Sequence, residues 1–243
     1  MERKIYQLMR DVEDTHWWFT ARREIVSKLL GSLSLSPEMK ILDVGCGTGG
    51  NFNMLSKFGQ LEGLECDEEA LLMARKRDVC PVLHGSMPEC VSIEGERYHL
   101  ITMFDVLEHI EDDRGTILKA WELLLPGGRL MLTVPAFPFL WSEHDTQHHH
   151  KRRYKRGQLE QLLIDAKFEP EYLTYYNTLL FPIVVAARLI KRVAGIHGDE
   201  EELPPPLLNR ALKQIMASER HLMPGIRLPF GVSLLAVCRK PLL

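Results

Sequence analysis

The sequence lacks a long hydrophobic run and an excess of either charge. Its most apolar stretch, residues 179–187, is shorter than the ~20 residues that a helix needs to cross a bilayer. The 243 residues have a formal net charge of -3, so no whole-chain attraction draws the protein to nucleic acid. With 45% hydrophobic and 26% charged residues, the composition is typical of a globular protein, and the length allows one α/β domain.

Cysteine is scarce and follows no metal-binding pattern. The cysteines form no CxxC pair, and the sequence has no HExxH zinc signature. They stand at positions 46, 66, 80, 90 and 238. Unpaired thiols are typical of a reducing compartment, and the charged start MERKIYQLMRDVED does not resemble a signal peptide. We therefore expect a cytoplasmic protein with reduced cysteines.

Short apolar strands alternate with helices from residue 39 onward. Before that point, Trp18, Ile25 and Leu29 recur at helical spacing and predict a leading helix. The expected strands are 40–44, 61–65, 79–86, 98–104, 129–135, 168–177 and 231–240. The expected helices are 51–59, 66–78, 114–128, 156–168, 178–194 and 207–222. This alternation predicts a mainly parallel sheet with helices on both faces.

A glycine-rich turn follows the first expected strand. It reads Asp-Val-Gly-Cys-Gly-Thr-Gly over residues 43–49, and glycine lets a ligand approach the backbone closely. About 20 residues further on, the next strand ends at Glu65, whose carboxylate can accept hydrogen bonds from two ribose hydroxyls. From these residues alone, a nucleoside cofactor and a dinucleotide both remain open.

Five segments, taken in order, resemble a known family. They are "ILDVGCGTG", "LEGLECDEEAL", "HGSMPE", "FDVLEHIED" and "LLLPGGRLMLTVP". Together they resemble the motifs of class I S-adenosylmethionine-dependent methyltransferases, in the type 11/23-like group related to ubiquinone-pathway O-methyltransferases. The resemblance is strong over residues 39–135 and looser elsewhere. It implies a seven-stranded Rossmann-like sheet with helices on both faces, in which the terminal strand runs antiparallel between strands five and six.

The resemblance also implies one domain, 1–243, built from four parts. These are an N-terminal helical cap, a cofactor-binding core, a helical insertion before the last strand, and a terminal strand: residues 1–38, 39–176, 177–230 and 231–243. The insertion is long for a simple connection. We expect it to form a lid over the methyl acceptor.

The implied cofactor is S-adenosyl-L-methionine, with S-adenosyl-L-homocysteine as product. The turn would hold its methionine part, although Asp43 could instead order the turn itself. Glu65 would hold the ribose. The remaining contacts implied by the motifs are made by Gly45, Cys46, Gly47 and Gly49 in the turn, by Cys66, Gly85, Ser86 and Met87 around the adenine, and by Phe104 near the sulfonium. Ser86 stands where many relatives carry aspartate, and Met87 or Phe104 could equally be core residues.

The segment "HWWFTARR" resembles a leading helix that closes over the cofactor in a subgroup of these enzymes. Arg22 or Arg23 could then pair with the cofactor carboxylate, because a guanidinium matches that geometry. The alternative is a helix that packs its aromatic residues on the sheet edge.

The segment "DVLEH" resembles the "ExxEH" of ubiquinone-pathway enzymes. There the two acids and the histidine, here Asp105, Glu108 and His109, can hold a divalent cation. The same "LEH" occurs in relatives that need no metal. We predict no metal site and keep these three residues as the alternative.

The stretch "WSEHDTQHHHKRRYKRGQL", residues 141–159, should border the acceptor. It resembles a subgroup pattern in which an aspartate, a histidine five positions later and Arg-Arg-Tyr recur. We predict that His150 is a general base whose tautomer Asp145 fixes, and that an arginine holds an anionic acceptor group. The alternatives are a zinc site among the four histidines, or a solvated loop anchored by Arg153 and Tyr154.

The predicted function is O-methylation of a small or lipid-like acceptor. The apolar helix at 178–194 ends in basic residues and favours a greasy substrate or peripheral membrane contact. No nucleic-acid partner is expected, although the basic run 151–156 leaves a nucleic-acid methyltransferase as an alternative. A non-catalytic cofactor-binding module is another, while GCGTGG lacks the GxGxxG frame of a dehydrogenase. The sequence does not indicate the acceptor's identity or the oligomeric state.

Overall fold

A seven-stranded mixed sheet forms the centre of the protein, in a computed structural model that describes residues 3–89, 93, 95, 97–194 and 203–242. The strand order is β3-β2-β1-β4-β5-β7-β6. The first five strands are parallel, and β7 runs antiparallel between β5 and β6. The strands are β1 (Lys40–Val44), β2 (Gln60–Glu65), β3 (Val82–His84), β4 (Tyr98–Phe104), β5 (Leu124–Pro135), β6 (Glu169–Tyr176) and β7 (Ser233–Arg239). The predicted fold class and the position of the terminal strand are confirmed.

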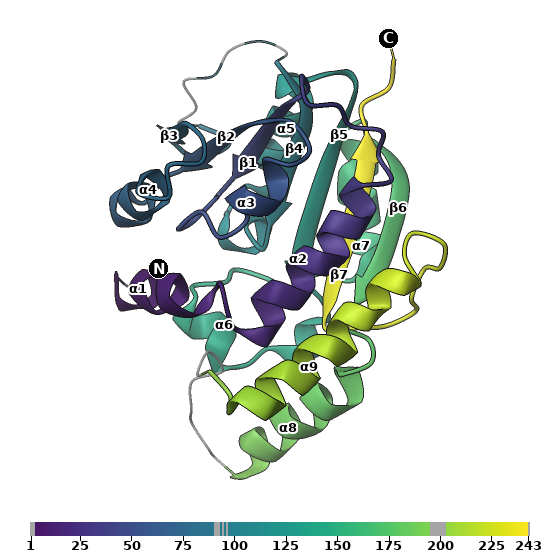
Figure 1. Ribbon diagram of the computed structural model, residues 1–243. Coiled ribbons are helices and arrows are strands. Elements are labelled where there is room, and N and C mark those ends of the chain that lie inside the picture. The colour runs from purple at the N-terminus through teal and green to yellow at the C-terminus, as the bar shows by residue number, and fades with distance from the viewer. Residues whose placement is uncertain (1–2, 90–92, 94, 96, 195–202, 243) are drawn as a thin grey trace.

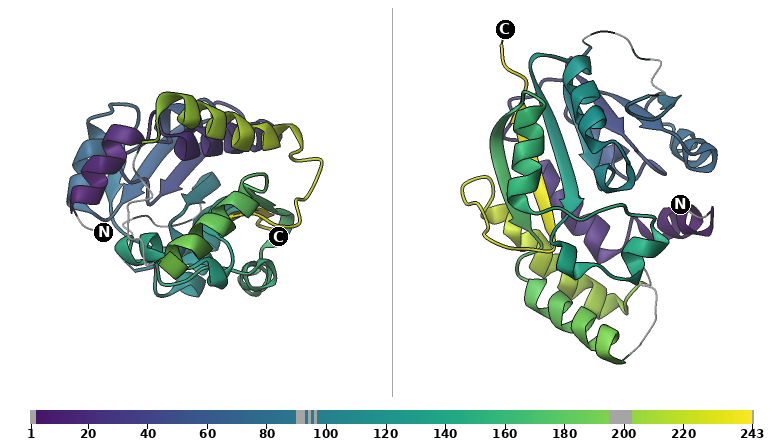
Figure 2. Two further views of the ribbon diagram at one scale, coloured as in Figure 1. Left: turned by 90° about the horizontal axis from the view of Figure 1, so that it is seen from below. Right: turned by 180° about the vertical axis from the view of Figure 1, so that it is seen from behind.

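Helices cover both faces of this sheet (Figures 1 and 2). The α-helices are α1 (Arg3–Val12), α2 (Trp17–Leu30), α3 (Phe52–Leu55), α4 (Glu68–Arg75), α5 (Asp113–Leu123), α6 (Glu143–Gln147), α7 (Arg156–Asp165), α8 (Phe181–Ala194) and α9 (Pro206–Ser218). Short 3-10 turns are η1 (Leu107–His109), η2 (Pro138–Leu140) and η3 (Glu219–His221). One core joins α5 and α7 to the sheet, and the other joins α2, α3, α4 and α9 to its opposite face.

The spacing of apolar residues explains why α2 lies where it does. Ile25 and Leu29 lie one helical turn apart and are buried against the sheet, as their periodicity predicts. Burying a side chain of this size contributes ~1.5–3 kcal/mol to folding. The helix ends at Gly31, whose N–H donates to the Ser27 carbonyl at 3.0 Å. The packing fixes α2 along one face of the sheet, with its N-terminal end toward the carboxyl ends of the parallel strands (Figure 1).

Several predicted elements were longer than the structure has them, among them 51–59, 156–168 and 207–222, and the excess in three others has a clear physical reason. The predicted helix 114–128 ends at Leu123, because Leu124 is extended and pairs with Tyr98 as the first residue of β5. The predicted helix 66–78 is the shorter α4, which begins after Asp67, whose carboxylate accepts the N–H groups of two following residues. The predicted strand 79–86 shrinks to β3, since Pro81 has no N–H to donate to a ladder.

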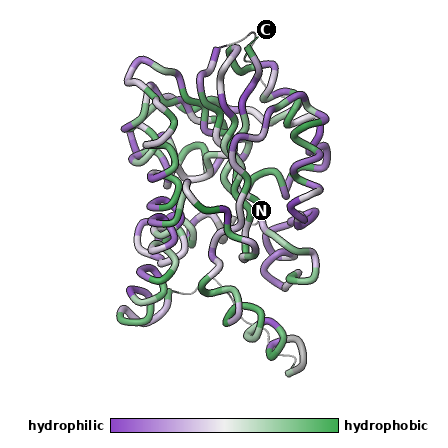
Figure 3. Tube along the Cα trace, turned by 90° about the vertical axis from the view of Figure 1, so that its right-hand side faces the viewer, coloured by the Kyte–Doolittle hydropathy of each residue, from purple (hydrophilic) through white to green (hydrophobic). Residues whose placement is uncertain are grey.

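The insertion between β6 and β7 divides into an anchored part and a projecting part. Helix α9 packs on α2 and buries Met216 and Ala217. Just after it, the buried Glu219 carboxylate accepts the N–H groups of Asn177 and Thr178 at 2.8 and 2.7 Å. Helix α8 lies at the end farthest from the C-terminus and carries apolar and basic residues (Figures 1 and 3). That residues 177–230 act as a lid stays a prediction.

Two further sequence-based points concern cysteines and membranes. Cys90 lies outside the described residues, and the other four cysteines are free thiols. Within the described ranges, no helix is both long enough and apolar enough to cross a membrane.

Candidate functional site

The glycine turn lies where β1 ends, at the carboxyl edge of the parallel strands. Gly45, Gly47 and Gly49 all have positive φ, so other residues would be strained there. A Cβ at Gly45 would come within 2.7 Å of Val106, and one at Gly49 within 2.7 Å of Phe52. A Cβ at Gly47 would meet nothing within 4 Å. Packing therefore requires two of these glycines, while Gly47 faces open space in which a ligand could approach the backbone.

Glu65 ends β2 directly beside this turn. Its side chain is buried, and Oε2 accepts the Gly47 N–H at 2.7 Å. Its Oε1 accepts the N–H groups of Cys66 and Asp67, both at 2.9 Å. Each carboxylate oxygen has two lone pairs, so Oε1 is fully used and Oε2 keeps one acceptor position for a ligand hydroxyl. The predicted ribose carboxylate and the predicted turn are thus brought together.

Asp43 is buried beneath the turn. Its Oδ1 accepts the Thr102 hydroxyl at 2.7 Å, and among the described residues its Oδ2 has no hydrogen-bond partner. Burial raises the pKa of Asp43 to about 7, although the Thr102 hydrogen bond acts in the opposite direction. The carboxyl group orders the strand end through Thr102, and a contact of its second oxygen with a cofactor stays a prediction.

The other residues predicted at the cofactor differ in exposure. Met87 and Phe104 are buried in the two cores, and the Cys46 thiol also faces the core, with Sγ 3.0 Å from a Cβ placed at Gly63. Only backbone atoms of residue 46 could then face a ligand in the turn. Cys66 is exposed beyond the end of β2.

Gly85 and Ser86 continue this edge after β3. The Gly85 N–H donates to the Glu65 carbonyl at 3.0 Å, which fixes the segment beside the proposed ribose position. Ser86 is half-buried. The contacts of both residues with a cofactor remain predictions.

Arg22 on α2 reaches the same edge from the N-terminal segment. Its guanidinium is buried, forms an ion pair with the Asp105 carboxylate, and lies 4.6 Å from the ring centre of Trp18. Asp105 has a φ of 57° at the end of β4. Arg22 is therefore engaged with a protein carboxylate, and its pairing with a cofactor carboxylate stays a prediction.

A second N-terminal contact was not predicted. The buried Glu13 carboxylate accepts the hydroxyl of Thr48, inside the glycine turn, and pairs with Arg77. Arg77 also donates from Nε to the Thr48 carbonyl at 2.8 Å. The helical cap is thus bonded to the turn that it covers. Glu13 lies in an acidic run of the sequence that gives no sign of this long-range contact.

Asp145 and His150 form the centre of the predicted acceptor side. The His150 Nδ1 lies 2.8 Å from Asp145 Oδ1, and Arg153 Nε donates to the same oxygen at 2.8 Å. Asp145 Oδ2 accepts the Ser142 N–H at 2.8 Å. Burial alone would raise the pKa of Asp145, but the hydrogen bond from His150 and the charge of Arg153 outweigh it and lower that pKa. The predicted Asp–His pair is present and rigidly held.

The neighbouring basic residues are engaged with the protein. Arg152 pairs with Asp113 at 2.8 Å, and the buried Tyr154 hydroxyl donates to the same carboxylate at 2.9 Å. Arg153 is committed to Asp145. These contacts give no support to the prediction that an arginine holds an anionic acceptor group. They do support the alternative that Arg153 and Tyr154 anchor the loop.

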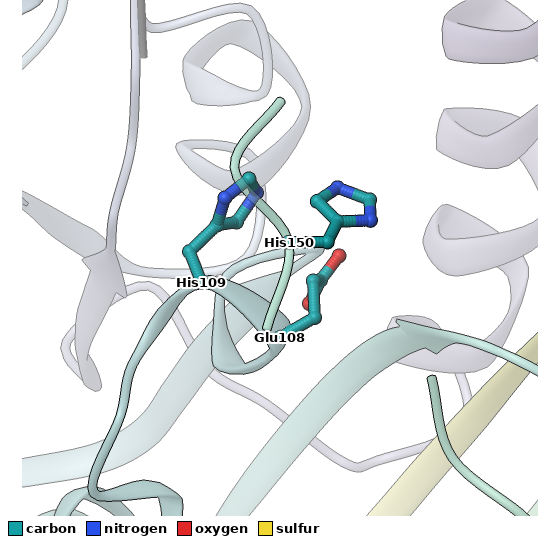
Figure 4. Close-up of side chains that lie close together, drawn as sticks. All are labelled: Glu108, His109 and His150. Carbon is teal, nitrogen blue, oxygen red and sulfur yellow. The ribbon is translucent and has the colours of Figure 1, made fainter. Parts of the chain in front are cut away.

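His150 also meets a second group of residues. Its ring centre lies 4.6 Å from that of His109, and one ligand atom from each of Glu108, His109 and His150 lies within 4.8 Å of the others (Figure 4). Burial, His150 and His148 lower the pKa of His109 to about 3. Asp105 does not belong to this group. The alternative metal site was Asp105, Glu108 and His109. In the structure Glu108 and His109 form the cluster with His150, without Asp105.

Comparison with known proteins agrees with this arrangement. A family profile described as methyltransferase domain matches residues 16–173. The chain belongs to this methyltransferase family. Its members use S-adenosylmethionine, so the recognised family and its cofactor agree with the sequence-based prediction.

Individual relatives are more distant. The mitochondrial ubiquinone biosynthesis O-methyltransferase of Schizosaccharomyces pombe is 27% identical over 126 residues, which are 49% of this chain and 46% of that protein. The chain thus spans about half the length of the curated relatives that it matches. A methyltransferase structure from Bacillus halodurans has a TM-score of 0.61 at 20% identity and covers 89% of this chain and 98% of that one. Phosphoethanolamine N-methyltransferase 2 of Haemonchus contortus, solved with S-adenosyl-L-methionine, has a TM-score of 0.58 at 16% identity, covering 89% and 52%. These two structures support the fold alone.

Proposed function

We propose that the protein transfers the methyl group of S-adenosylmethionine to a hydroxyl oxygen of a small, lipid-like acceptor, with His150 as general base. When bound, the cofactor supplies a methyl group on a positively charged sulfur. The chain's own residues fit it: Gly47 leaves open space, Glu65 offers a carboxylate beside the turn, and Asp43 has an oxygen without a partner. The mechanism then requires the acceptor hydroxyl to be aligned and deprotonated.

The observation that carries this proposal is the contact between Asp145 and His150. Asp145 accepts the Nδ1–H of His150 at 2.8 Å, which leaves Nε2 as the unprotonated nitrogen that can take a proton. The His150 N–H also donates to the Asp145 carbonyl at 2.8 Å, so the backbone holds the two residues in register. A neutral imidazole with a fixed tautomer suits proton removal near neutral pH.

An aromatic surface beside this pair supports a lipid-like acceptor. Phe137 stacks on Tyr175 with ring centres 5.1 Å apart. The ring centres of Phe139 and Phe181 lie 5.3 and 5.7 Å from that of Phe137. The Phe139 side chain is 60% exposed. Ala136, next to Phe137, accepts a hydrogen bond from Arg153 at 3.1 Å, so this surface is one residue from the network that holds His150. An apolar chain could lie here with its hydroxyl end at His150.

Helix α8 extends the same surface. Ile183 and Ile190 are 63% and 62% exposed, and Lys191 follows them on the helix. Exposed apolar residues with a basic neighbour favour peripheral contact with a membrane that contains the acceptor. We therefore infer a cytoplasmic protein that visits the membrane surface. The name of the S. pombe relative is consistent with transfer to oxygen and with a greasy substrate.

The two other function classes have weaker support. A nucleic-acid methyltransferase would need free cations in the run 151–156, but Arg152 and Arg153 are paired with Asp113 and Asp145. A non-catalytic module would bind S-adenosylmethionine without turnover.

The test is a screen for turnover with labelled S-adenosylmethionine and lipid, quinone and sugar acceptors. Once an acceptor is found, His150→Ala should lower turnover by ~10²-fold or more and leave affinity for S-adenosylhomocysteine unchanged. The neighbouring His149 is exposed, and its positive φ tolerates asparagine, so His149→Asn is the matched control. Equal turnover in all three proteins would refute the role of His150. No turnover with any acceptor class would favour the binding module.

A further inference from the structure

The side chain of Glu108 is fully buried, and neither of its carboxylate oxygens has a hydrogen-bond partner among the described residues. Burying a carboxylate whose oxygens accept no hydrogen bond is costly, so such a group needs an explanation. The neighbouring hydrogen-bond network does not satisfy Glu108, because Ser142, His150 and Arg153 donate to Asp145. What lies next to Glu108 is a pair of imidazole rings, those of His109 and His150.

These three side chains come from two segments that are bonded together. Glu108 and His109 lie on η1, and His150 lies on the loop after α6. The Lys151 N–H donates to the Glu108 carbonyl at 2.7 Å and fixes that loop against η1. Figure 4 shows the three side chains directed toward one another. Their ligand atoms lie within 4.8 Å of one another, and zinc bonds of ~2.0–2.2 Å in a tetrahedral site would place them ~3.4 Å apart. Small side-chain rotations close that difference.

We propose that Glu108, His109 and His150 bind one divalent transition-metal cation such as Zn²⁺. Two imidazoles and one carboxylate suit this class of metal better than Mg²⁺ or Ca²⁺ and leave at least one position open for a ligand. A metal-binding histidine commonly donates its other ring N–H to a carboxylate, and His150 has Asp145 in that position at 2.8 Å. The third ligand is thus His150, because the Asp105 carboxylate pairs with Arg22.

The inference deepens the proposed function and rests on it for the use of the site, not for the binding of the metal. With the cation in place, Nε2 of His150 would be a ligand and would no longer act as the general base, and the acceptor hydroxyl would take the open position. The cation would make that hydroxyl more acidic, so that its proton would pass to solvent water. The acceptor oxygen then forms the new bond to the methyl carbon, and the sulfur leaves with the electron pair of the broken bond.

The experiment measures metal binding directly. Tag-free protein is stripped with a chelator and titrated with Zn²⁺ by calorimetry, and with Co²⁺ by visible absorption. We expect one cation per chain and Co²⁺ bands of a four- or five-coordinate site. Glu108→Gln and His150→Ala should each weaken binding at least ~10-fold, whereas the control His149→Asn should bind like the wild type. Binding of S-adenosylhomocysteine serves as the folding control for each variant.

Three results would overturn the metal site. These are no saturable Zn²⁺ binding by the wild type, equal binding by the Glu108→Gln and His150→Ala variants, or a loss of binding in His149→Asn. The Co²⁺ spectrum of the wild type does not depend on any variant folding. Methyl transfer that persists in metal-free protein would remove the cation from the reaction and leave His150 as general base, so the two proposals fail separately.

Discussion

Replacing Asp145 with asparagine tests the network that holds His150. The buried carboxylate accepts hydrogen bonds from Ser142, His150 and Arg153, and the Arg153 side chain is 2% exposed. Asparagine has one acceptor oxygen, so its NH₂ group must face one of these donors. It also leaves a buried guanidinium without its carboxylate. Breaking a buried pair in this way costs ~3–5 kcal/mol. For a domain of this size, that corresponds to a fall in Tm of roughly 6–20 °C.

The assay is thermal unfolding followed by circular dichroism. The control is Asp165→Asn, an exposed carboxylate bonded to Gln161 at 2.8 Å, which should change stability by no more than about 0.5 kcal/mol. Because the folded protein lowers the pKa of Asp145, its contribution is complete above the unfolded pKa of ~3.9 and is lost as pH falls further. The gap between wild type and Asp145→Asn should therefore narrow below pH 4. A Tm for Asp145→Asn within 2 °C of the wild type, on the order of 1 kcal/mol or less, would refute this reading of the network.

Four other substitutions probe the cofactor edge and the N-terminal segment bonded to it. Gly45→Ala should destabilise the protein by more than ~1 kcal/mol, whereas Gly47→Ala should mainly weaken S-adenosylhomocysteine binding; equal stability losses in chemical denaturation would contradict the distinction. Since the folded protein raises the pKa of Asp43 to about 7, its stability should fall as pH rises from about 4 through about 7, and Asp43→Asn should remove that slope; parallel pH–stability curves would count against a buried, protonatable Asp43. Glu13→Gln leaves the buried Arg77 without its nearest carboxylate, so limited proteolysis should cut the N-terminal segment roughly 10-fold faster, and unchanged cleavage would mean that this contact does not hold the cap.

The sheet could be predicted from the sequence because its signals are local. The alternation of apolar strands with amphipathic helices indicates where the strands and helices lie. The order of the motifs indicates which strand of the family's fold each one forms. Glu65 and the glycine turn were predicted at one cofactor, and the carboxyl ends of adjacent parallel strands place them side by side. Asp145 and His150 are only five positions apart, so a local sequence pattern was enough to predict their contact. These predictions needed no knowledge of how distant loops fold.

The remaining contacts depend on tertiary packing that no local pattern encodes. Glu13 reaches Thr48 across 35 positions, and the loop that carries His150 returns to η1 about 40 residues after Glu108. For the same reason the alternative metal set included Asp105, which the packing of α2 instead gives to Arg22. Hydrophobic periodicity describes which face of an element is buried and carries no information about where a polar loop lands.

The most direct test of the account is S-adenosylhomocysteine binding, measured by calorimetry on wild type, Glu65→Ala and His150→Ala. The account divides the site into a cofactor side around Glu65 and an acceptor side around His150. It predicts that Glu65→Ala binds at least ~10-fold more weakly, because a hydrogen bond from a ligand hydroxyl to a charged carboxylate contributes ~1.5–3 kcal/mol. It predicts that His150→Ala binds like the wild type. Equal affinity of Glu65→Ala and wild type, or a loss of binding in His150→Ala, would contradict this division.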